Sequence, residues 1–183
     1  IQDAETGNDL NVYRFDQHNA HLYGAEFHVD IHPHPLDWLH FENTFSYTIG
    51  RFNTALAGTT NLPFIPAARL VSELRGNFFS KGKSLKNLYI SVSYDYTFKQ
   101  KNPFTGYNTE TATGSYVIVN AAVGTDIMNK GKQIFSIHLS ASNLGDAAYQ
   151  NHLSRLKYTS ANNVTGRQGV YEMGRNFSIK VNV

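Results

Sequence analysis

The sequence predicts an all-β protein, built as an antiparallel up-and-down meander of about seven long strands. Three observations predict it: side-chain polarity alternates with a period of two, the connections alternate between short and long, and charged residues are few. Of the 183 residues, 16% are charged and 13% are aromatic, whereas an ordinary soluble domain is about 25% charged. This composition and a mean hydropathy of −0.37 indicate that the apolar residues are interspersed with polar ones along the chain.

Alternation of apolar and polar residues marks each strand. The clearest case is the segment 88–98, where apolar or aromatic residues occupy every second position and only Tyr89 departs from the polar set. A period of two is typical of a strand with one apolar and one polar face. In chain order the alternating segments are 23–32, 39–49 (with Asn43 as an exception on the apolar face), 69–79, which is the weakest, 88–98, 117–124, 135–142 and 176–183.

Short and long connections follow one another along the chain. The short ones are 33–35, 81–83 and 129–132, and the long ones are 52–68, 100–115 and 143–168. Consecutive strands therefore pair antiparallel, with every long loop at one rim and every short turn at the other. This is the pattern of outer-membrane barrels, whose strands of about 9–11 residues are longer than the usual 5–6.

Alternation alone leaves two environments for the apolar face. In a transmembrane barrel this face meets lipid, and aromatic residues near strand ends form interfacial girdles. Candidates for such girdles are Trp38, Tyr47, Tyr94, Tyr96, Tyr116 and Tyr171. The alternative is a soluble, lipocalin-like β-barrel that turns its apolar faces inward and binds a small apolar ligand.

Charge and cysteine content exclude other classes. A formal net charge of +2 gives no field that would attract nucleic acid. The absence of cysteine excludes a disulfide scaffold and a cysteine-rich zinc module. No segment is a continuous apolar run of about 18 residues, so membrane helices are not expected.

The strand count suggests part of a larger barrel. An odd number of strands does not close a bacterial barrel, in which the counts are even. The chain begins at Ile1 without an initiator methionine and ends at Val183 inside a strand pattern. We therefore expect a C-terminal barrel segment, residues 1–183, that is trimmed at its ends.

Several short motifs resemble those of TonB-dependent outer-membrane receptors, in family order from about Tyr13 to the end. They are Leu22-Tyr23-Gly24-Ala25-Glu26-Phe27 with Asp37-Trp38-Leu39 and Ser46-Tyr47-Thr48, then Ile65-Pro66-Ala67-Ala68-Arg69-Leu70, Gly114-Ser115-Tyr116-Val117-Ile118-Val119-Asn120 without the family's proline, Ser142-Asn143-Leu144-Gly145-Asp146-Ala147-Ala148-Tyr149, Asn151-His152-Leu153-Ser154-Arg155-Leu156-Lys157 and Met173-Gly174-Arg175-Asn176-Phe177. The chain ends in valine, whereas outer-membrane barrels usually end in an aromatic residue.

The resemblance implies a barrel of about 22 strands filled by an N-terminal plug, and import of a scarce metal or metal chelate with energy passed on by TonB. The substrate classes it implies are zinc, haem and iron–siderophore complexes. Implied partners are the plug and N-terminal strands of the same receptor, TonB, outer-membrane lipid and the chelate. No resident cofactor is implied. The segment from 1 to 183 would lack the plug.

No catalytic motif is present, so we expect a protein that is not an enzyme. A barrel lipase would need a serine–histidine pair at a rim, and His152 and Ser154 are too close in sequence to favour that alternative. The predicted ligand-binding residues at the long-loop rim are His18, His21 and His152, which suit a metal or haem, with Tyr107, Tyr149 and Tyr158 for stacking on a chelate.

Polar positions within the strands give a second set of candidates. Glu26, His28, Asp30 and His138 are predicted to face the lumen, where they line either a ligand path or simply a hydrated wall. At the opposite rim, His32, His34 and His40 gather around a proline turn. They form either a metal site or ordinary interfacial residues, and the metal is not identified by the sequence.

Overall fold

The computed structural model describes residues 16–79, 81 and 83–183. The chain start at Ile1, the motif boundary at Tyr13 and Gly82 of one predicted turn lie outside the described residues. No helix in this part of the chain is long and apolar enough to cross a membrane, a finding that does not bear on β-barrels.

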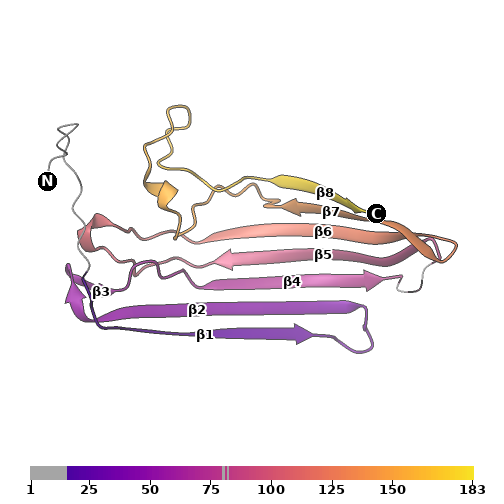
Figure 1. Cartoon of the computed structure of the whole chain (residues 1–183), viewed down its shortest axis with the longest axis horizontal. Helices are drawn as coiled ribbons and strands as arrows, with labels where there is room; N and C mark the ends of the chain where they lie inside the picture. Colours follow the sequence, from indigo (N-terminus) through magenta and orange to yellow (C-terminus); the bar gives the residue numbers. More distant parts are fainter. Residues whose placement is uncertain (1–15, 80, 82) are drawn as a thin grey trace.

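The described residues form one antiparallel sheet, which confirms the predicted all-β meander (Figure 1). The strands are β1 (Ala20–Ile31), β2 (Leu39–Leu56), β3 (Thr59–Asn61), β4 (Arg69–Phe78), β5 (Leu85–Thr97), β6 (Tyr116–Asn129), β7 (Lys132–Ser142) and β8 (Asn176–Asn182), with two 3₁₀ turns, η1 (Gly106–Asn108) and η2 (Arg155–Tyr158). Seven strands pair in chain order, β1-β2-β4-β5-β6-β7-β8, and the short β3 pairs with the end of β2.

Two strands continue well beyond the ends expected from the sequence. The strand predicted at 39–49 continues to Leu56 and makes a hairpin with β3 inside the predicted loop 52–68. The strand predicted at 117–124 continues to Asn129, where Lys130 and Gly131, both with positive φ, form the turn into β7. Polar residues such as Asn53 and Thr125 obscured these extensions, because backbone pairing does not require an apolar face.

The register explains the two exceptions to the alternation. Asn43 lies on the apolar face beside its cross-strand partner Ser72, whose hydroxyl donates to the Asn43 side chain at 2.7 Å. Tyr89 lies on the polar face opposite Gly124 and bonds His138 at 3.3 Å. A Cβ at position 124 would come within 2.5 Å of both the Tyr89 and His138 rings, so glycine makes room for the pair.

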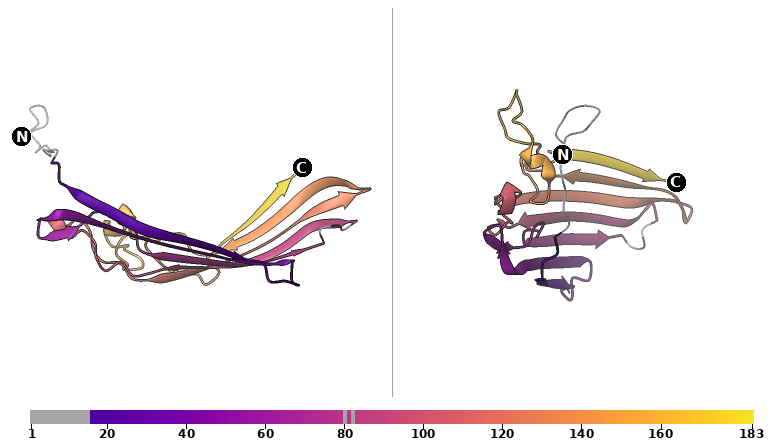
Figure 2. Two further views of the ribbon diagram at one scale, coloured as in Figure 1. Left: turned by 90° about the horizontal axis from the view of Figure 1, so that it is seen from below. Right: turned by 60° about the vertical axis from the view of Figure 1, so that its left-hand side comes forward.

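Both faces of the sheet remain largely exposed (Figure 2). The accessible surface is 13004 Å², against roughly 8,900 Å² expected for a compact protein of this mass. Among the described residues, only Phe104 and Ile118 are buried hydrophobic side chains. The lipocalin-like alternative requires an enclosed apolar interior, and the described part of the chain has none. The twisted sheet is open, with β1 and β8 as its edges.

All long connections leave one end of the sheet and all short turns leave the other, as predicted (Figure 1). The last long connection is 143–175, longer than the predicted 143–168, and β8 begins at Asn176, where the alternation predicts the last segment to begin. Tyr171 therefore lies in this loop and does not start a strand.

Asn143 anchors the exit from β7 into the last loop. It is only 3% exposed and has a positive φ of 51°. Its amide nitrogen donates to the carbonyl oxygens of Ala147 (2.9 Å) and Met173 (3.3 Å), and its side-chain oxygen accepts from the Ala147 amide at 2.9 Å. One asparagine therefore joins both ends of a loop of more than thirty residues.

We expect Asn143→Ala to destabilise the last loop by about 1–3 kcal/mol, because buried backbone groups lose their partners. Asn143→Asp keeps the acceptor and loses the donor, so its effect is intermediate. The measurement is amide hydrogen exchange across 143–175. The exposed Asn163→Ala in the same loop is the matched control, and equal exchange in the two alanine variants would contradict the anchor role.

Candidate functional site

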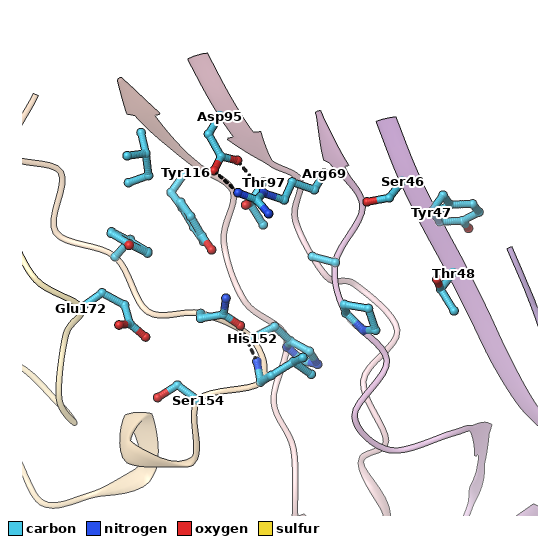
Figure 3. Close-up of a pocket in the computed structure, with 16 residues that line it drawn as sticks. Ser46, Tyr47, Thr48, Arg69, Asp95, Thr97, Tyr116, His152, Ser154 and Glu172 are labelled. Atoms are coloured by element: carbon cyan, nitrogen blue, oxygen red, sulfur yellow. Dashed lines mark hydrogen bonds and ion pairs between the residues drawn. The ribbon is translucent and has the colours of Figure 1, made fainter. Parts of the chain in front are cut away.

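A pocket of about 700 Å³ lies on the polar face at the long-loop end of the sheet. Strand ends of β2, β4, β5 and β6 form its floor, and Pro66 and Ala67 of the first long loop together with the last long loop supply its wall (Figure 3). The lining residues are Ser46, Tyr47, Thr48, Pro66, Ala67, Arg69, Asp95, Thr97, Tyr116, Ile118, Tyr149, Asn151, His152, Leu153, Ser154 and Glu172.

An ion pair between neighbouring strands forms part of the floor. The guanidinium of Arg69 on β4 donates through Nε to Asp95 on β5 at 2.8 Å and through a second nitrogen to the other carboxylate oxygen. Such a two-point contact fixes both side chains in one geometry. The opposite charges balance each other, so the charge that remains on the pocket wall is the exposed carboxylate of Glu172.

Two tyrosines meet across the pocket wall. The ring of Tyr116 at the start of β6 lies 4.4 Å from the ring of Tyr149 in the last loop. The register pairs Tyr116 with Thr97 and puts it on the polar face, so its assignment to an aromatic girdle on the apolar face is wrong. Burial, the nearby Glu172 carboxylate and Tyr116 raise the pKa of Tyr149, which keeps its phenol neutral and able to donate a hydrogen bond.

Buried polar residues tie the three long loops together behind this pocket. Glu110 is 5% exposed and accepts hydrogen bonds from the amides of Phe64 (2.8 Å) and Phe104 (3.1 Å), which joins the first and second loops. His152 contacts Thr113 through Nδ1 at 3.1 Å, which joins the second and third. Lys157 donates to the His152 carbonyl at 2.5 Å. We call Glu110, Thr113, His152 and Lys157 the loop cluster.

His152 is the titratable centre of the loop cluster. Its side chain is 2% exposed, and its Nε2 lies 3.8 Å from Glu110 Oε2 without a hydrogen-bond partner among the described residues. Burial and the positive charge of Lys157 lower the pKa of His152, and Glu110 offsets only part of this. The imidazole is therefore neutral at pH 7. Its ring contacts Thr113. No hydrogen bond among the described residues joins it to Ser154, so the structure does not support the hypothesis of a barrel lipase.

Tyr158 closes the opposite side of the loop cluster. Its hydroxyl accepts the Thr111 amide at 3.1 Å, and its ring lies 5.0 Å from the Lys157 ammonium. Burial acts to raise the pKa of Tyr158, but the hydrogen bond from Thr111 and the charge of Lys157 outweigh it and lower the pKa. Tyr158 and Tyr149 also line a neighbouring pocket of about 500 Å³.

The remaining candidates at the long-loop rim lie apart from the loop cluster. His18 packs edge-on against Phe52, and His21 stacks on Tyr23 and contacts the Asn53 side chain at 3.1 Å. Tyr107 in η1 is 73% exposed and packs near Phe104. His18, His21 and His152 do not form a common ligand set among the described residues, so their role in capturing a metal stays a prediction.

The candidates within the strands lie on the polar face. His28 contacts Thr44 at 3.0 Å, and His138 contacts Tyr89. Glu26 pairs with Ser46, and Asp30 pairs with Glu42. The structure thus puts all four on one side of the sheet, while a path for a ligand along them remains a prediction.

At the short-turn end, one group of side chains brings metal-ligand atoms together. It consists of Asp30, His32 and His40, the only such group of three in the described part of the chain. The predicted cluster contained His34 in place of Asp30, but the His34 ring instead lies 3.3 Å from Asp37.

Sequence reasoning missed Arg69, Asp95, Glu110, Lys157 and Glu172. The first two were detectable, because a period of two and an antiparallel register put them on one face of adjacent strands. Glu110, Lys157 and Glu172 lie in long loops without periodicity, so no pattern in the sequence indicated that they are near the pocket.

No family model matches the sequence, and no curated protein matches it either. Among solved structures, the chain is similar to the copper transporter OprC, with a TM-score of 0.71 and 15% identity. The alignment covers 90% of this chain and 24% of that chain, so this chain spans about a quarter of the transporter's length. At this identity the likeness shows the fold alone: an antiparallel β-sheet arranged like one stretch of that protein.

We expect the long loops to loosen as the pH falls. Because the pKa of His152 lies below its ordinary 6.5 in the folded state, the unfolded loop binds a proton more readily than the folded one. The stability that the neutral His152 contributes to the loops is fully present above about pH 7.5 and is lost as the pH falls through 6.5. Hydrogen exchange in 143–175 at pH 7.5 and 5.5 measures this. His152→Gln removes the titration and should reduce the pH effect, while the exposed His34→Ala should leave it unchanged.

Proposed function

We propose that this chain is a segment of an outer-membrane TonB-dependent receptor that imports a metal ion or metal chelate. The observation that carries the proposal is the open sheet with one exposed apolar face and one polar face that bears a loop-walled pocket. Similarity to a copper transporter over most of the chain supports uptake of a metal by such a barrel. The receptor acts by binding and gated passage and not by covalent chemistry.

In this proposal the remainder of the barrel, the plug and the TonB-contacting segment are supplied by the rest of the receptor. The apolar face meets outer-membrane lipid, and the polar face is the lumen wall. The long loops are extracellular and the short turns are periplasmic, as in other outer-membrane barrels. The edges at β1 and β8 need further strands, because an unpaired edge is not tolerated in lipid.

The pocket suits a chelate better than a bare ion. Its wall offers tyrosine hydroxyls, the exposed carboxylate of Glu172 and the hydroxyl of Ser154, which can hydrogen-bond a polar organic ligand. Aromatic faces at Tyr116 and Tyr149 can stack on a planar group such as haem. Zinc, haem and iron–siderophore complexes are the proposed substrate classes, and copper joins them through the structural likeness.

Uptake assays in cells test this function. The full-length receptor should import labelled copper, zinc or haem iron only when TonB is functional.

Tyr149→Ala/Glu172→Ala should weaken substrate binding at least about tenfold, the effect of a lost charge-assisted contact. The double variant His18→Ala/His21→Ala tests capture of the substrate at the rim. Val164→Ala, 94% exposed in the same loop, is the control. Import that continues without TonB would contradict the proposal.

Charges on the two faces of β4 test the membrane orientation. Leu74 on the apolar face is 50% exposed, and its neighbour Glu73 lies on the polar face opposite Glu42. We expect Leu74→Arg to destabilise the barrel in lipid by about 2–4 kcal/mol, the cost of arginine near the bilayer midplane.

Glu73→Arg is the matched control and should be tolerated, since its new charge faces the Glu42 carboxylate. Stability is measured by urea unfolding of the full-length receptor in phospholipid vesicles. Equal loss of stability in the two variants would contradict the lipid-facing assignment.

A further inference from the structure

A compact group of metal-ligating side chains lies at the end of the sheet opposite the pocket. The pairing of β1 with β2 runs through Asp30 with Glu42 to Ile31 with Phe41. The next opposed positions are 32 and 40, so His32 and His40 face each other on the same side as Asp30. Sequence spacing alone does not reveal this, because the proline turn separates the two histidines.

The distances within this group are close to those of a metal site. Asp30 Oδ2 lies 2.7 Å from His32 Nε2, and the rings of His32 and His40 are 4.3 Å apart, edge to face. One ligand atom from each of the three residues lies within 4.8 Å of the others. Ligands in a tetrahedral site with bonds of ~2.0–2.1 Å are about 3.3 Å apart, so small side-chain rotations close the site.

The surroundings favour a cation. The carboxylate of Asp30 is followed across the sheet by Glu42 on β2 and Glu73 on β4 in the same row. One opposing charge on the neighbouring strand is Arg75, the register partner of His40. Arg75 is engaged elsewhere, because its Nε donates to Asn77 at 3.0 Å and its guanidinium lies 4.1 Å from the Tyr89 ring.

The backbone around the group is fixed. Leu39 donates its amide to the Leu36 carbonyl at 2.8 Å, and Asn77 on β4 donates to the Trp38 carbonyl at 2.7 Å. The Trp38 ring packs 5.2 Å from Phe78. Asp30 and His40 therefore lie on strands and not on a free loop. His32 and Asp30 are exposed, which leaves coordination positions open to water.

We propose that Asp30, His32 and His40 bind a divalent transition-metal ion of the Cu²⁺ or Zn²⁺ class. Two imidazoles and one carboxylate are the donor set that such ions prefer, and Cu²⁺ binds a given set of this kind more tightly than Zn²⁺. We call this group the short-turn metal site. It does not depend on which substrate the receptor imports, since binding here needs only the three side chains.

Titration of the full-length protein in detergent with Cu²⁺ and with Zn²⁺ at pH 7.5 tests the site. We expect the wild type to bind one ion more than His32→Ala, His40→Ala or Asp30→Asn, or to bind it at least tenfold more tightly than these variants. The Cu²⁺ electron paramagnetic resonance spectrum of the wild type should show hyperfine lines from imidazole nitrogen. These lines should be lost in the variant that combines Asp30→Asn, His32→Ala and His40→Ala.

His34→Ala is the matched control. His34 lies in the same turn, and within the described residues its ring forms a hydrogen bond with Asp37 and not with the metal-site residues. Circular dichroism verifies that each variant retains the sheet. Equal stoichiometry and affinity in wild type and His32→Ala would overturn the proposal, and so would a loss in His34→Ala as large as that in His32→Ala. A receptor that binds the ion here but imports no metal would count against the proposed function alone.

Discussion

The antiparallel hydrogen-bond ladder from β1 to β8 is the constraint on which the other features depend. Because side chains alternate along each paired strand, one register assigns every residue to a face. The ladder runs in chain order, so the apolar sides of all strands form one surface and the polar sides form another. Nothing in the described part of the chain covers the apolar surface, and this is the ground on which we propose that lipid covers it.

The ladder also decides where the long loops meet. Three long connections leave the same end of adjacent strand pairs, close enough for Glu110 to reach the amides of Phe64 and Phe104. Buried polar groups of this kind must find partners, and here Glu110 and His152 each find one in another loop. The pocket is the consequence: its floor belongs to the strands, while its wall exists only because the loop cluster and Asn143 hold the last loop against them.

The two ends of the sheet carry different chemistry for a physical reason. At the long-loop end, hydroxyls, rings and a carboxylate surround a cavity, which suits a polar organic ligand. At the short-turn end, the tight hairpin between β1 and β2 brings ligand atoms of two imidazoles and a carboxylate within 4.8 Å of one another.

The sequence by itself determined the all-β class, the meander, the two rims and the sorting of most residues to two faces, because a period of two is a local property of a strand. It also indicated Tyr149, Tyr158 and His152 as loop residues of interest, although not that His152 is buried. Only the tertiary structure decided that Tyr116 lines the pocket, that Tyr89 pairs with His138 over Gly124, and that Asp30 and not His34 joins His32 and His40. These contacts depend on register and on loop paths, which are set by long-range pairing and leave no periodic trace in the chain.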